Sequence, residues 1–227
     1  MLNYIYPDVC VACEAPASPE SSLCETCTTK LTYINNDTSC SACHGLNDTA
    51  TRLCSNCLKT PPKWSHSTSA FAFEGLAREL ILRFKYSRHL YLLDFLCREM
   101  NSSYQAKQLP EFDIITYVPM HPLKKLNRGW NQSELLAKEF ASLYPNSECL
   151  ALLKRRHLGK AQASKAKRDR LKSVKDLFSP KNRDKIKDRS ILLIDDILTT
   201  GATLNACCKA LQQEKPKEIS VLTIARG

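Results

Sequence analysis

The sequence predicts an α/β protein in which a small N-terminal metal-binding module, residues 1–62, precedes a domain with a mostly parallel sheet, residues 63–227. Three observations support this prediction. Eight of the twelve cysteines stand in Cys-x-x-Cys pairs within the N-terminal module. Short branched apolar runs alternate with helix-like segments in the rest of the chain. One of these runs, in the stretch ILLIDDILTTGATL (191–204), continues into two aspartates and a threonine-glycine turn.

The N-terminal module contains the same cysteine pattern twice, 30 residues apart. Each copy has the spacing Cys-x2-Cys-x10-Cys-x2-Cys, with a leucine before the third cysteine. Two thiolates three residues apart present both sulfurs to one ion, and two such pairs complete a tetrahedral site. The spacing leaves open whether the pairs combine within a repeat or between repeats, and we favour pairing within each repeat. We therefore predict a zinc-ribbon-like module that binds two zinc ions through Cys10, Cys13, Cys24, Cys27, Cys40, Cys43, Cys54 and Cys57.

Other cysteine chemistries fit this module less well. A disulfide scaffold belongs to an oxidising compartment, and MLNYIYPDVC does not resemble a secretory signal. Cys40-Ser-Ala-Cys43-His44 matches the haem-attachment string, but the sister repeat has Glu14 in the place of His44. No apolar run approaches the roughly 18 residues that span a bilayer, so we expect a cytoplasmic protein. The module has two candidate roles, a structural clamp or docking surface and a nucleic-acid contact.

The formal charge of +10 is concentrated in one part of the chain. Residues 154–189 contain 15 Lys or Arg and four Asp, a balance of +11, whereas the remaining residues sum to −1. A concentrated basic segment indicates phosphate-bearing partners, either small or polymeric. The alternative is a solvated basic face.

The domain after Pro61-Pro62 is predicted from its periodicity. Apolar side chains recur on one helical face in residues 74–86, and residues 89–100 repeat this pattern. Residues 113–119 form a branched apolar run that ends at a proline, which is typical of a strand. The later elements are a helix over 131–144, a strand over 148–153, a candidate helix over 163–174, a strand over 190–194, a helix over 201–213 and a strand over 218–225. In such sheets, ligands gather at the carboxyl ends of the strands.

The residues that follow the strand at 190–194 suit a ribose 5-phosphate. A helix start offers free backbone N–H groups and a positive dipole end, so it binds phosphate well. A glycine lets the backbone approach the anion, and threonine hydroxyls donate to it. Two carboxylates suit a ribose diol or a hydrated Mg2+. The alternative is that these residues only cap the helix that follows. One capping side chain would suffice for that, whereas the pattern supplies two aspartates and three threonines. The residues concerned are Asp195, Asp196, Thr199, Thr200, Gly201 and Thr203.

This stretch resembles the ribose-phosphate loop of type I phosphoribosyltransferases, the enzymes that use phosphoribosyl pyrophosphate (PRPP). A second loop, VPMHPLKKLNRGWNQ (118–132), places basic residues after a strand, and type I enzymes bind pyrophosphate on such a loop. Its Val-Pro and Arg-Gly-Trp-Asn-Gln parts resemble the ComF/GntX family of competence proteins, as do the segment from Gln162 to Val174 and the four Cys-x-x-Cys pairs. The resemblance spans nearly the whole chain. Trp130, Lys165 and Ser173 depart from the family's usual Phe, Leu and Asn.

The resemblance implies roles for the matching positions. Asp195 and Asp196 would contact the ribose diol or Mg2+. The 5-phosphate would be bound by Thr199, Thr200, Gly201, Ala202 and Thr203. Pyrophosphate or another anion would be bound by His121, Arg128, Gly129, Asn131 and Gln132. A largely basic set would contact DNA or phosphate, and part of it would close over the site: Lys154, Arg155, Arg156, Lys160, Gln162, Lys165, Lys167, Arg168, Arg170 and Lys172.

The resemblance further implies a protein that handles incoming single-stranded DNA in natural transformation or uses DNA as a nutrient. Its implied partners are the competence helicase and the uptake machinery at the inner membrane. The basic segment, with Tyr117, Trp130 and Phe178 near the anion-binding loops, suits a groove that follows phosphates and stacks bases. The alternative function is an active phosphoribosyltransferase that joins PRPP to an unidentified acceptor and releases pyrophosphate. No segment resembles the hood with which salvage enzymes select a base.

Overall fold

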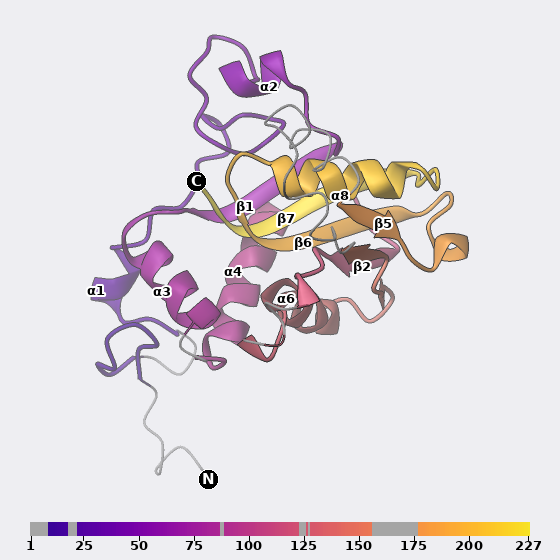
Figure 1. Cartoon of the computed structure of the whole chain (residues 1–227). Helices are drawn as coiled ribbons and strands as arrows, with labels where there is room; N and C mark the ends of the chain where they lie inside the picture. Colours follow the sequence, from indigo (N-terminus) through magenta and orange to yellow (C-terminus); the bar gives the residue numbers. More distant parts are fainter. Residues whose placement is uncertain (1–8, 18–21, 87–88, 123–125, 127, 156–176) are drawn as a thin grey trace, which may run out of the picture.

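A five-stranded parallel sheet forms the centre of the computed structural model, which describes residues 9–17, 22–86, 89–122, 126, 128–155 and 177–227 (Figure 1). Every pair of neighbouring strands in this sheet is parallel. The predicted α/β class with a mostly parallel sheet is therefore confirmed. In spatial order the strands are β1 (His66–Ala72), β7 (Glu218–Arg226), β6 (Ser190–Leu198), β2 (Ile114–Tyr117) and β3 (Glu148–Cys149).

Helices cover both faces of the sheet, because successive side chains of a strand point to opposite faces. In β6, Leu192 and Ile194 belong to a core cluster that includes α3 (Gly75–Tyr86), α4 (Leu92–Ala106) and α6 (Gln132–Ser142). Ile191 and Leu193 belong to a second cluster, which includes α8 (Ala202–Gln212). We call these the α3–α4–α6 face and the α8 face.

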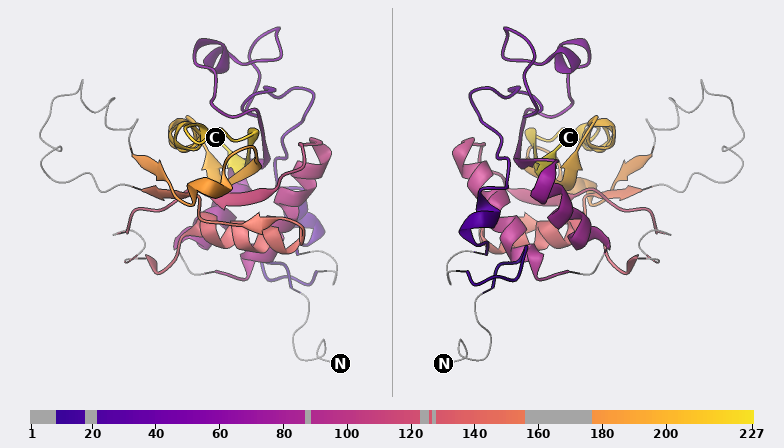
Figure 2. Two further views of the ribbon diagram at one scale, coloured as in Figure 1. Left: turned by 90° about the vertical axis from the view of Figure 1, so that its right-hand side faces the viewer. Right: turned by 90° about the vertical axis from the view of Figure 1, so that its left-hand side faces the viewer.

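A short antiparallel ribbon of β4 (Leu153–Arg155) and β5 (Phe178–Pro180) packs against α8. The ribbon is followed by a 3-10 turn, η2 (Arg183–Lys185). The views in Figure 2 show the ribbon on the opposite side of the molecule from α3 and α4. The two strands bracket residues 156–176, so the candidate helix over 163–174 lies outside the described residues.

The two cysteine repeats pack on opposite faces of the sheet (Figure 1). The first contains α1 (Glu25–Thr28) and packs into the core of the α3–α4–α6 face, whereas the second contains α2 (Ser55–Lys59) and packs into the core of the α8 face. The chain between them runs beside the edge strand β1, where Tyr33 forms an antiparallel bridge with Phe71. This connection covers a sheet edge that would otherwise be unpaired.

Two predicted strands differ from those observed, and one observed strand was not predicted. The unpredicted strand is β1, whose segment HSTSAFA lacks a run of branched apolar residues. The strand expected over 190–194 continues to Leu198, because β7 pairs with it along that length. The strand expected over 148–153 is divided between β3 and β4, which belong to different sheets. Within the described ranges, no helix is both long and apolar enough to cross a membrane.

Candidate functional site

Asp195 and Asp196 lie inside strand β6. The sequence had predicted a strand that ends just before them. The β6–β7 ladder runs on to Leu198, whereas β2 pairs with β6 only as far as Ile194. The two aspartates therefore pass the end of β2 and reach the carboxyl edge of the sheet on that side. This edge is where parallel α/β sheets collect their ligands.

Each aspartate has one side-chain partner from a distant part of the chain. Ser133 Oγ, at the start of α6, donates to Asp195 Oδ1 at 2.8 Å. Lys85 Nζ, near the end of α3, lies 2.9 Å from Asp196 Oδ2, and the side chains of this pair are only 14% and 19% exposed. Neither Lys85 nor Ser133 was predicted from the sequence. Ser133 directly follows Asn131-Gln132 and could have been found there, whereas no local signal marked Lys85.

The pKa of Asp195 lies well above the ordinary value of an aspartate. Burial and the charge of Asp196 raise the pKa of Asp195 to about 7, against the opposing effects of Ser133 and Lys85. Asp195 therefore gains or loses its proton near neutral pH, and it can both donate and accept hydrogen bonds there.

The predicted phosphate loop surrounds the start of α8. Residues 195–204 other than Asp196 line a hollow of about 50 Å3 at this point. Gly201 adopts a left-handed conformation with φ of 73° and precedes the first residue of α8. The side chains of Thr199, Thr200 and Thr203 are exposed, so their hydroxyls can reach a ligand. Exposed donors at a helix start are suited to a phosphate group.

The second predicted loop is held in place by its own polar side chains. Asn131 Nδ2 donates to the carbonyl of Val118 at 3.0 Å, and Gln132 Nε2 donates to the carbonyl of Lys85 at 3.3 Å. Arg128 donates to Gln132 Oε1 at 2.7 Å. Asn131 and Gln132 are buried, so they connect β2, α3 and α6 beside the acidic pair.

The remaining predicted contacts of this loop are more accessible. The Arg128 guanidinium also lies 4.6 Å from the centre of the Tyr86 ring, a cation–π contact. Gly129 is exposed and has a φ of 92°, and His121 is partly buried after β2. Arg128, Gly129 and His121 are therefore the members of this set that an anion could approach.

The basic set is described only at its first positions. Lys154 is exposed on β4, and the Arg155 guanidinium lies 5.7 Å from the centre of the Phe178 ring. Phe178 is 6% exposed and belongs to the core of the α8 face, so it does not offer the stacking surface that the sequence analysis suggested. The other predicted contacts lie outside the described residues: Arg156, Lys160, Gln162, Lys165, Lys167, Arg168, Arg170 and Lys172.

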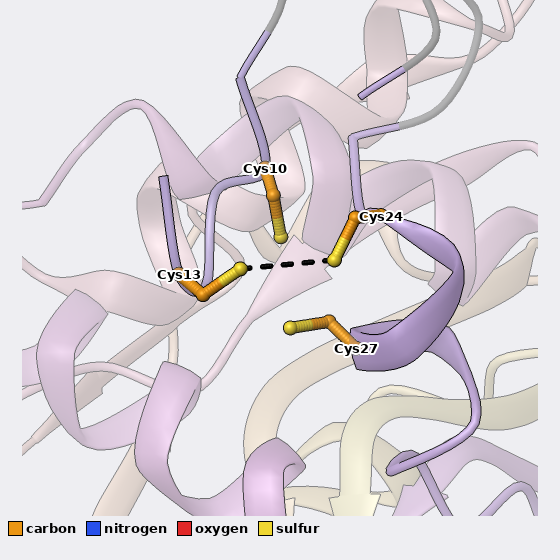
Figure 3. A group of neighbouring side chains, drawn as sticks. All are labelled: Cys10, Cys13, Cys24 and Cys27. Atoms are coloured by element: carbon orange, nitrogen blue, oxygen red, sulfur yellow. Dashed lines mark hydrogen bonds between the residues drawn. The ribbon is translucent and has the colours of Figure 1, made fainter. Parts of the chain in front are cut away.

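The eight paired cysteines form two separate four-sulfur groups, one within each repeat. In each group the sulfurs all lie within 4.8 Å of one another. Figure 3 shows the four side chains of the first group converging from two segments of the chain. The pairing within each repeat that we favoured is confirmed. The members are Cys10, Cys13, Cys24 and Cys27 in the first group, and Cys40, Cys43, Cys54 and Cys57 in the second.

The sulfur spacing fits a tetrahedral zinc ion. Cys13 Sγ lies 3.7 Å from Cys24 Sγ, and Cys43 Sγ lies 3.8 Å from Cys54 Sγ. Four sulfurs about 2.3 Å from a central zinc would be about 3.8 Å apart, whereas a disulfide needs about 2.05 Å. Metal binding would supply most of the folding energy of each site, since few large apolar residues surround the cysteines in the sequence.

The haem-attachment alternative does not fit the position of His44. The side chain is 1% exposed. The backbone N–H of Ser69 donates to Nδ1 at 3.0 Å, so Nε2 carries the proton and donates to Asn36 Oδ1 at 2.8 Å. Nδ1 therefore holds the second repeat against β1, and Nε2 connects the repeat to Asn36 in the chain between the two repeats.

Comparison with protein families identifies two regions of the chain. A model described as "Phosphoribosyl transferase domain" matches residues 136–227, and one described as "Double zinc ribbon domain" matches residues 1–58. The second match includes both four-cysteine groups and supports zinc as their metal.

Several curated proteins are similar to this chain over most of its length. Competence protein F of Haemophilus influenzae is 30% identical over 77% of this chain and 78% of its own length. Competence protein ComFC of Streptococcus pneumoniae is 30% identical over 86% of this chain and 92% of its own length. The DNA utilization protein YhgH of Escherichia coli K12 is 25% identical over 97% of both chains.

Proposed function

The chain belongs to the competence protein F (ComF) family, and we propose that it handles incoming single-stranded DNA in natural transformation while retaining a site for PRPP or a related ribose 5-phosphate. The names of the relatives, which refer to competence and DNA utilization, support the general role. The observation that carries the proposal is the position of helix α8. Its first turn forms the predicted phosphate loop, and its side packs against the ribbon that bears the basic segment.

The ribose-phosphate part of the proposal rests on the acidic pair and the loop. Asp195 and Asp196 would accept hydrogen bonds from the ribose diol, and Ser133 and Lys85 orient their carboxylates. The exposed threonines and the start of α8 would donate to the 5-phosphate. A Mg2+ ion bound with PRPP would neutralise pyrophosphate charge, and the carboxylates of the acidic pair, which directly precede the loop in the chain, could supply oxygen ligands to it.

The DNA part of the proposal rests on charge. Residues 154–189 have a balance of +11, and both ends of their central stretch leave from the β4–β5 ribbon. Clustered Lys and Arg side chains favour a phosphate backbone, because each phosphate contact releases counterions. We propose that the segment works in the cytoplasm, where thiols stay reduced and can hold zinc, together with the DNA helicase and uptake machinery.

The decisive experiment is the double variant Asp195→Asn with Asp196→Asn. PRPP binding, single-strand binding and transformation frequency are measured in parallel on this variant and on the wild type. We expect PRPP binding to be lost, with folding and zinc content retained. Loss of DNA handling as well makes the ribose-phosphate site part of the DNA function, whereas loss of PRPP binding alone makes the two sites independent.

Salt dependence tests the DNA part separately. The affinity for a fluorescent single-stranded oligonucleotide should fall as salt rises, because each phosphate contact releases a counterion. An oligonucleotide that does not bind at low salt, or binds equally at all salt concentrations, would contradict this part of the proposal.

An active phosphoribosyltransferase is the second candidate function, and the intact acidic pair favours it. Positive charge develops on the ribose as pyrophosphate leaves, and two nearby carboxylates stabilise such charge. The test is release of pyrophosphate from PRPP in the presence of nucleobases or nucleic acids. No release with any acceptor would exclude turnover while leaving binding intact.

A further inference from the structure

The second cysteine group is connected to the phosphate loop through Arg226. Arg226 Nε donates to the carbonyl of Cys43 at 3.2 Å, and Nη2 lies 3.6 Å from Cys43 Sγ. On its other side, Nη1 donates to the carbonyls of Leu198 and Thr199 at 3.0 and 2.8 Å. A single guanidinium therefore joins a predicted metal ligand to the first residues of the loop. Its planar fork makes this connection stiff.

Residues that follow the second repeat add further contacts to the same loop. Trp64 Nε1 donates to the carbonyl of Ala42 at 2.7 Å, and its ring packs against Gly201. The backbone N–H of Lys63 donates to Asn205 Oδ1, in the first turns of α8, at 2.7 Å. A pocket of about 290 Å3 lies between the second repeat and the loop, and its lining includes Cys43, Asn56, Thr199, Thr200, Asn205 and Arg226.

The first cysteine group contacts a different part of the fold. Ala12 occupies the position of Ala42, and its carbonyl accepts from Arg83 of α3 at 3.0 Å on the opposite face of the sheet. One further difference between the repeats is the glycine at position 45. A Cβ added to Gly45 would lie 2.9 Å from Arg226 Nε, whereas the first repeat has Ala15 at this position. The missing Cβ at Gly45 therefore leaves the room that the Arg226 guanidinium occupies.

We propose that the second cysteine group, and not the first, controls ligand affinity at the phosphate loop, with Arg226 as the positioning residue. The inference rests on the proposed ribose-phosphate site. A metal bound at the second group holds Cys43, Cys43 holds Arg226, and Arg226 holds the carbonyls of Leu198 and Thr199. The backbone amides of the loop are then already ordered before the ligand arrives, so binding loses less conformational entropy.

The first experiment compares Cys54→Ser with its repeat counterpart Cys24→Ser in the full chain. Zinc content, affinity for ribose 5-phosphate and for PRPP, and amide hydrogen exchange of residues 199–205 are measured. We expect each variant to lose one of two zinc ions. Only Cys54→Ser should weaken ligand binding, by about tenfold, and speed exchange in the loop. Equal effects of the two variants on affinity and exchange would overturn the proposal.

The second experiment leaves both cysteine groups intact. Arg226→Ala should keep two zinc ions yet weaken ribose 5-phosphate binding about tenfold and speed loop exchange, with partial recovery in Arg226→Lys. Gly45→Ala should act in the same direction, because the added methyl displaces the guanidinium. The control is Arg83→Ala, which removes an arginine contact of the first repeat, the one to the carbonyl of Ala12. Wild-type affinity and exchange in Arg226→Ala would overturn the inference.

Failure of the proposed function gives a different result. If the wild-type protein binds neither ribose 5-phosphate nor PRPP, the ribose-phosphate site is wrong. Hydrogen exchange of residues 199–205 needs no ligand, so it still decides whether Arg226 and the second cysteine group order the loop. Unchanged exchange in both Arg226→Ala and Cys54→Ser would then overturn the connection itself.

Discussion

Lys85 Nζ lies 2.9 Å from Asp196 Oδ2, and this ion pair joins the end of α3 to strand β6 at the carboxyl edge of the sheet. Both side chains are mostly buried, so the carboxylate of Asp196 has exchanged water for Lys85. Removal of one partner leaves the other desolvated and unpaired.

Lys85→Met should therefore lower the free energy of unfolding by about 2 kcal/mol. Urea denaturation measures this change. The matched control is Lys138→Met on α6, where Lys138 pairs with Glu134 at 2.9 Å but is 62% exposed. Exposed pairs contribute about 0.5 kcal/mol, so equal losses in the two variants would contradict a buried role for Lys85.

The pH dependence of stability should report Asp195. Its pKa is raised from the ordinary 3.8 to about 7, so the folded protein binds more protons than the unfolded chain between these values. Stability is then lost as pH rises through this window. Between pH 5 and 8 the melting temperature should fall as pH rises, and the part of this fall that comes from Asp195 should disappear in Asp195→Asn. If the melting temperature of the variant falls as steeply with pH as that of the wild type, another titrating group causes the fall.

A side chain at the left-handed glycine of the predicted phosphate loop should destabilise the protein. Gly201 has a φ of 73°, and an added Cβ would lie 3.0 Å from Trp64 Cη2. Gly201→Ala should cost about 1–3 kcal/mol of stability, through backbone strain and displacement of the indole. Gly129→Ala is the control, since it also has positive φ but nothing within 4 Å of an added Cβ. A larger loss in the control would mean that the Trp64 contact contributes nothing.

The two metal sites should load independently, because they lie on opposite faces of the sheet and share no ligand. Elemental analysis should find two zinc ions per chain, and Cys27→Ser or Cys57→Ser should each leave one. A strong chelator should lower the melting temperature, since each site folds around its ion. Loss of both ions in a single-site variant would show that the repeats fold as one unit.

Much of the candidate site was predictable because its chemistry is local in sequence. The Cys-x2-Cys-x10-Cys-x2-Cys spacing brings each four-cysteine group together from fewer than 20 residues. The acidic pair lies on a strand, and the loop at 199–203 follows within a few residues at the start of a helix. These residues are therefore close in space because they are close in the chain.

Strand β1 escaped prediction because its burial depends on partners elsewhere in the chain. Its segment HSTSAFA contains three hydroxyl residues in a row, which are all nearly inaccessible in the structure. Ser67 Oγ donates to the carbonyl of Ala42, and Ser69 Oγ lies 2.6 Å from Thr223 Oγ1. Buried hydroxyls are tolerated when such partners exist, and no local pattern reveals the partners.

By itself, the sequence determined the fold class and the composition of both four-cysteine groups, and it predicted the phosphate loop, since these follow from periodicity and short spacing. Only the tertiary structure decided that two repeats with the same cysteine spacing have different neighbours, Arg83 for the first and Arg226 for the second. It also decided that Lys85 and Ser133 hold the acidic pair. These contacts join residues far apart in the chain, and their physical cause is the packing of helices and repeats on the two faces of one parallel sheet.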